Sequence, residues 1–64
     1  MGQEIWGQVK ADLDEAERRL GEAKEYLKAL EEAGEDVTAL REEVRILESR
    51  ITRWRTMLKR RGIE

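Results

Sequence analysis

Apolar residues recur along this chain at alternating steps of three and four positions, and this spacing constrains the fold more than any other feature. One series runs over residues 6–30 and a second over residues 37–58. A seven-residue repeat kept for three to four periods is typical of helices that pack through a narrow apolar seam. A strand would need a period of two, which the chain lacks at useful length. We therefore predict an all-α protein.

The members of the two series are our candidates for the core and for an oligomer interface. They are Trp6, Val9, Leu13, Ala16, Leu20, Ala23, Leu27, Leu30, Val37, Leu40, Val44, Leu47, Ile51, Trp54 and Leu58. Because Trp54 occupies a core position of the repeat, we expect its indole ring to be buried.

The two series are out of phase, and a stop signal and a start signal lie where the phase breaks. Gly34 can adopt the left-handed conformation that ends a helix. Asp36 can accept hydrogen bonds from the first free amides of the next helix, and its charge suits the positive end of the helix dipole. So short a connection makes the two helices antiparallel neighbours. The expected organisation is a single hairpin over 1–64, with helices at about 3–33 and 37–61, a loop at about 34–36, and fraying at 62–64.

Folding the chain about residue 35 predicts which residues meet. Ala16 then faces Trp54, and Ala23 faces Leu47, so that small side chains lie opposite large ones. The charges agree with this pairing, because residues 1–34 carry five basic and nine acidic side chains, whereas residues 35–64 carry eight and six. We expect the acids of residues 12–17 to lie opposite arginines of residues 50–55.

The composition limits what such a hairpin can do. The chain has 64 residues with no cysteine and no histidine, so thiolate or imidazole metal sites and histidine-activated nucleophiles are excluded. No acid lies in the core stripes. We therefore predict no catalytic residues, no cofactor and no metal. A chain this short needs additional burial, and we favour a homodimer that forms a four-helix bundle, with a trimer or a heterologous protein partner as alternatives.

The other partner classes receive less support. Arg50, Arg53, Lys59, Arg60 and Arg61 form a candidate nucleic-acid face around Trp54. Acidic partners and the helix dipole also explain these cations, so we rank the nucleic-acid interpretation lower. No apolar run approaches the ~20 residues of a membrane span, so we expect no membrane partner. A soluble protein is expected, cytoplasmic if it is natural or recombinantly expressed.

Two glycines inside the first predicted helix, Gly7 and Gly21, occupy the same position of the repeat. Each costs about 1 kcal/mol relative to alanine. They are either tolerated on an outward face or mark the close approach of a neighbouring helix.

The order of heptad stripe, Gly34–Glu35–Asp36 loop and second stripe resembles the Rop-type RNA-binding hairpins and, equally, designed helical-hairpin proteins. The resemblance covers the whole chain and is architectural. It implies an antiparallel four-helix bundle made of two hairpins, and for Rop-type proteins the binding of RNA hairpins through the first helix. The regular stripes and the near balance of surface charges favour a designed or engineered chain.

One substitution tests whether the stripe is the core. Leu20→Asp would place an unpaired charge in the seam, which is strongly unfavourable. We expect circular dichroism and sedimentation to show loss of helicity and of assembly together. A variant that kept its helical signal would contradict the assignment of this stripe to the core.

Overall fold

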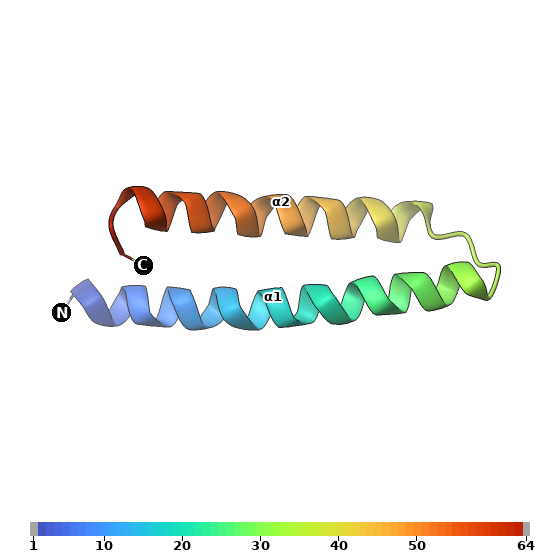
Figure 1. The fold of residues 1–64 in the computed structure, drawn as a ribbon, viewed down its shortest axis with the longest axis horizontal. Coiled ribbons are helices and arrows are strands. Elements are labelled where there is room, and N and C mark those ends of the chain that lie inside the picture. Colours follow the sequence, from blue (N-terminus) through green and yellow to red (C-terminus); the bar gives the residue numbers. More distant parts are fainter. Residues whose placement is uncertain (1, 64) are drawn as a thin grey trace.

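A computed structural model describes the backbone of residues 2–63 and the side chains of residues 4–63. The chain folds into two antiparallel helices, α1 (Gly2–Glu32) and α2 (Thr38–Arg60), joined by a short loop. Figure 1 shows that the two ends of the chain lie together, opposite the loop. The all-α hairpin predicted from the apolar spacing is therefore confirmed.

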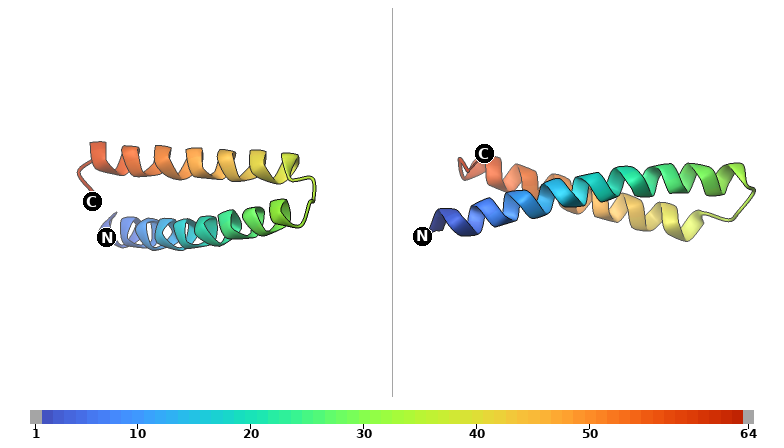
Figure 2. Two further views of the ribbon diagram at one scale, coloured as in Figure 1. Left: turned by 45° about the vertical axis from the view of Figure 1, so that its right-hand side comes forward. Right: turned by 90° about the horizontal axis from the view of Figure 1, so that it is seen from below.

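The helices begin and end one residue away from the predicted boundaries. α1 starts at 2 and stops at 32 rather than at about 3 and 33, and α2 spans 38–60 rather than about 37–61. The hairpin is a rod of 50 × 16 × 13 Å. In Figure 2 the helices lie side by side in one view and cross at a shallow angle in the other, as helices packed through a heptad seam do. Within residues 2–63, neither helix is long and apolar enough to cross a bilayer.

Both helices end in the same backbone motif, and a glycine makes it possible each time. Gly34 has φ 83° and Gly62 has φ 71°, the left-handed region that side chains disfavour. The Gly34 amide donates to the carbonyl of Glu31 at 3.0 Å, and the Glu35 amide donates to that of Leu30 at 2.9 Å. This pair of bonds is the Schellman motif, which satisfies carbonyls that the end of a helix leaves free.

Asp36 acts as predicted at the start of α2. Its carboxylate accepts hydrogen bonds from the backbone amide of Thr38 at 3.0 Å and from the Thr38 hydroxyl at 2.8 Å. These hydrogen bonds lower the pKa of the Asp36 carboxyl, and the one from the backbone amide of Thr38 has the largest effect. Val37, which precedes the helix, is buried rather than capping. The loop therefore combines a stop at Gly34 with a start at Asp36, separated by one residue.

The core is a single column of side chains at seven-residue intervals on each helix. Those of α1 face those of α2 along the length of the hairpin, and Leu58 is fully enclosed. The buried residues are Leu13, Leu20, Leu27, Val37, Val44, Ile51 and Leu58. The Leu20→Asp variant would thus place its charge in the middle of this column.

The two glycines inside α1 leave open space around them. A Cβ atom added at Gly7 or Gly21 would meet no other heavy atom within 4 Å among the described residues. Close approach of the neighbouring helix within the hairpin, one of the two interpretations above, is therefore not their role.

Two substitutions of glycine by alanine should change stability in opposite directions. Gly34→Ala would meet no atom within 4 Å, but its φ of 83° should cost about 1–2 kcal/mol. Gly21→Ala lies in an exposed helical turn and should stabilise by about 0.5–1 kcal/mol. Urea unfolding followed by circular dichroism at one fixed protein concentration measures both. Equal shifts of the same sign would contradict the left-handed role of Gly34.

Candidate self-association surface

One edge of the helix contact is closed by ion pairs, which we call the ion-pair edge. Three links join the helices along it: Glu31 to Arg41, Lys24 to Glu48, and the pair Asp14 and Glu17 to Arg55. Successive links are seven residues apart on α2, so one link forms at each heptad. All the interhelix ion pairs among the described residues lie on this edge. Exposed pairs contribute only a few tenths of a kcal/mol each, so their main effect is on alignment.

Arg55 makes the most extensive of these links. Its guanidinium donates to Glu17 at 2.9 Å and to Asp14 at 2.7 Å, and its side chain is 26% exposed. These hydrogen bonds raise the pKa of Arg55, the bond to Glu17 most. The expected meeting of the acids at 12–17 with the arginines at 50–55 is thus realised by Arg55. Glu15 instead binds Arg18 and Arg19 of its own helix, and the hydrogen bond from Arg18 is the main cause that lowers its pKa to about 2.

The opposite edge of the helix contact is apolar and uncovered in the single chain, and we call it the open edge. It carries the second column of the heptad repeat, whose side chains are half-buried or exposed. The column comprises Val9, Ala16, Ala23 and Leu30 on α1 and Leu40, Leu47 and Trp54 on α2. Both predicted stripes are therefore split: one position of each heptad closes the hairpin, and the other faces outward beside it.

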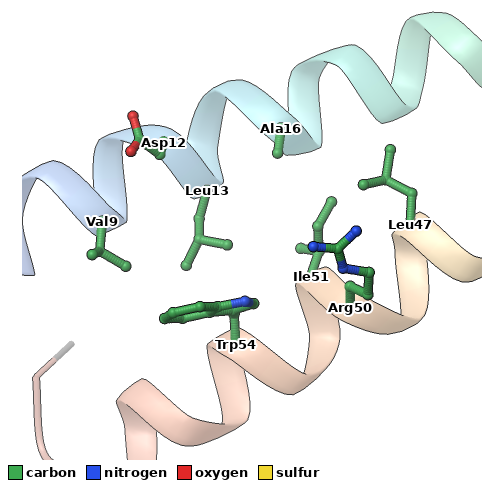
Figure 3. Close-up of a pocket in the computed structure, with 8 residues that line it drawn as sticks. All are labelled: Val9, Asp12, Leu13, Ala16, Leu47, Arg50, Ile51 and Trp54. Atoms are coloured by element: carbon green, nitrogen blue, oxygen red, sulfur yellow. The ribbon is translucent and has the colours of Figure 1, made fainter.

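A groove of about 300 Å³ runs along the open edge (Figure 3). Leu13 and Ile51 of the core form its floor, and Ala16 leaves space between the helices because its side chain is small. Asp12 on α1 and Arg50 on α2 stand at its rims. The groove is thus apolar inside and bears opposite charges on its two sides.

Trp54 does not bury its ring, contrary to the prediction. The residue is 44% exposed and lines the groove from α2 (Figure 3). The prediction was wrong because two helices enclose only the column of side chains that lies directly between them. A residue at the other heptad position needs a third or fourth helix to cover it.

The other large exposed apolar residues share the side of the open edge. Ile5 is 65% exposed, Tyr26 60% and Ile46 45%. Helical periodicity of 3.6 residues places Ile5 and Tyr26 next to the open column. Ile46, two positions after the buried Val44, lies farther round α2, away from the core and from the ion-pair edge. Met57, half-buried, occupies the corresponding position near the end of α2. Exposed apolar residues that are scattered singly are normal on a protein surface. Here they lie on the same side of the hairpin as the open edge, so they widen its apolar surface.

The five residues of the candidate nucleic-acid face do not form one surface. Arg50, Arg53 and Arg60 recur at helical spacing beside the open edge, and Arg53 lines a hollow with Trp54 and Met57. Lys59 lies on a different face of the helix. Arg61 lies over the ring of Trp6, 5.8 Å from its centroid. The structure therefore separates three arginines from the two other cations.

The turn after α2 was expected to fray but is held in place, and sequence reasoning missed it. The Gly62 amide donates to Lys59 and the Ile63 amide to Leu58, which repeats the motif that ends α1. Ile63 packs against the core, and the Lys10 ammonium donates to its carbonyl at 3.0 Å. The signal was present, because Leu58 precedes Gly62 by four residues as Leu30 precedes Gly34. Glu64 lies outside the described residues.

The acidic side chains that the structure describes all lie on exposed surfaces. Among residues 4–63, no group of three or more acids lies close enough to hold a metal ion. The lowered pKa of Glu15 arises from ion pairing on an exposed surface and not from burial in a cleft. Comparisons of the chain with protein-family models, with curated proteins and with solved structures gave no match.

Proposed function

We propose that this chain is a structural, self-associating helical hairpin whose open edge binds a second copy and which has no catalytic activity. Two hairpins that cover each other's open edges would form a four-helix bundle with a closed core. The observation that carries the proposal is the difference between the two edges. Ion pairs close one edge, while the other carries the half-buried second column of the heptad repeat and the exposed Trp54.

The size of the chain supports the same conclusion. A domain of about 60 residues buries only about 60% of the surface of its unfolded chain, so its stability is marginal. The hairpin has one column of buried side chains, and disulfides are excluded because there is no cysteine. Burial of the open column would add Leu40, Leu47 and Trp54 to the enclosed apolar surface. Burial stabilises by about 25 cal/mol for each Å² of apolar surface removed from water, so covering this column would add to the stability of the hairpin.

A charge placed on the open edge should prevent association and leave the hairpin folded. In Trp54→Lys, loss of a central aromatic contact costs about 2 kcal/mol or more, so the dissociation constant should rise at least tenfold. Because Trp54 is already 44% exposed in the single chain, helicity should persist. Sedimentation equilibrium across micromolar concentrations, with circular dichroism on the same samples, measures both effects.

Ser49→Lys provides the matched control, since it adds the same charge to an exposed position of α2 away from the open edge. It should leave the dissociation constant unchanged. A folded wild-type chain that stays monomeric at these concentrations would overturn self-association. A dimer that tolerates Trp54→Lys would place the interface elsewhere, and a hairpin that associates only with a different protein would favour the heterologous alternative.

Nucleic-acid binding is a second candidate, and one structural observation favours it. The exposed ring of Trp54 lies beside Arg53 and Met57, with Arg50 on the preceding turn. Exposed aromatic rings flanked by arginines stack on bases and neutralise phosphates. The same ring cannot serve both purposes at once, so this function would compete with dimerisation.

Retardation of single-stranded RNA or DNA in a gel tests this candidate. Binding through this surface should weaken as salt rises and should fall at least several-fold in Arg53→Glu and Arg60→Glu. Arg45→Glu is the control, because Arg45 pairs with Glu42 on the other side of α2. No retardation at low salt, or equal losses in all three variants, would exclude a binding surface at the open edge.

We also infer that the chain is a designed or engineered helical hairpin. Its apolar steps run without interruption within each helix, both helices end in the same glycine motif, and charges of both signs are interspersed over the surface. Agreement of pattern, caps and surface charge is what design rules prescribe for such a fold.

A further inference from the structure

The two helices contribute side chains of different size to the open edge. The middle of α1 presents Ala16 and Ala23, whereas α2 presents Leu47 and Trp54. If α1 packed on α1 of a second copy and α2 on α2, small residues would meet small ones and large would meet large. The first contact would leave voids and the second would force the helices apart. Packing of α1 on α2 of the second copy brings the two alanines in the middle of α1 against the helix that carries Leu47 and Trp54.

The two helices also differ in the charges that they place beside the open edge. On α1 the flanking series carries three acids and one arginine, and on α2 it carries three arginines and one acid. These residues are Asp12, Glu15, Arg19 and Glu22 on α1, and Glu43, Arg50, Arg53 and Arg60 on α2. Like charges across an interface are unfavourable, whereas opposite charges select partner and orientation. Contact between α1 and α2 of different copies therefore satisfies both size and charge.

Only one two-fold arrangement of hairpins joined through the open edge makes this contact. If the symmetry axis runs parallel to the helices, each α1 lies antiparallel to α2 of the other copy and both loops lie at the same end. If the axis runs across the helices, α1 meets α1 and the loops lie at opposite ends. In the first arrangement, each residue also lies at the same position along the helix axis as the equivalent residue of the other copy. Trp54 and Ala16 line the same groove, so the grooves of the two copies face each other and Trp54 of one chain lies near the groove of the other.

We propose that the second copy docks with its loop at the same end, so that each α1 packs antiparallel on α2 of the other chain. This inference rests on the self-association proposed above. It adds the orientation of the two copies, which the apolar strip alone does not fix.

Distances between spin labels on single cysteines test the orientation, since the chain has no cysteine of its own. Glu35→Cys labels the loop, and Lys59→Cys labels the opposite end of α2; both positions are exposed. With interaxial distances of 8–10 Å, either labelled chain should give an intermolecular backbone separation of about 10–20 Å in its dimer. Hairpins with opposed loops would instead give about 30 Å or more at both positions, because the copies of each label would lie near opposite ends of a 50 Å rod.

A mixture of the two labelled chains supplies the converse measurement. In mixed dimers the loops-together arrangement gives a long distance between the two kinds of label, and the opposed arrangement gives a short one. Long distances within each labelled dimer, with a short distance in the mixture, would overturn the proposed orientation while leaving self-association intact. Labelled and unlabelled chains that both sediment as monomers would overturn self-association itself, so the two failures are distinguishable.

Discussion

The rest of the structure depends on the fact that two helices can enclose only one column of side chains. Leu13 and Leu20 of α1 meet Val44 and Ile51 of α2 along the line where the helices face each other, and this contact supplies the buried core of the hairpin. The hydrophobic effect drives burial in proportion to area, so the second column of the repeat keeps its surface in contact with water until another element covers it. That residual surface is the reason for regarding this chain as part of an assembly.

The two edges of the hairpin differ in chemistry, because ion pairs cross one edge and apolar side chains line the other. On the ion-pair edge, Arg55, Arg41 and Lys24 reach acids on the other helix and fix how far one helix is displaced along the other. They add little stability, since they are exposed. On the open edge, α1 carries the small side chains of Ala16 and Ala23, whereas α2 carries the large ones of Leu47 and Trp54. The same small residues that leave a groove in the single chain would provide space for the second copy proposed above.

The ends of the helices show how far local rules extend. Gly34 and Asp36 act as predicted, because a left-handed glycine and an aspartate before a helix have few other roles in so short a segment. Gly62 obeys the same rule and was overlooked, since the end of a chain is commonly assumed to fray. Its consequence is not local: Ile63 is brought back onto the core, and Lys10 of the other helix binds its carbonyl.

The sequence by itself determined the helices, the hinge and the membership of the two columns, because each follows from periodicity or from the chemistry of one or two residues. It also indicated which residues meet, and the ion pairs of Arg55, Arg41 and Lys24 lie within two residues of the pairing about residue 35. Only the tertiary structure decided which column closes the hairpin and which stays open. Both columns have the same spacing and similar hydrophobicity, so the choice depends on how each helix rotates about its axis when it meets the other. That rotation exposes Trp54 and places Ile5, Tyr26 and Ile46 on the side of the open edge.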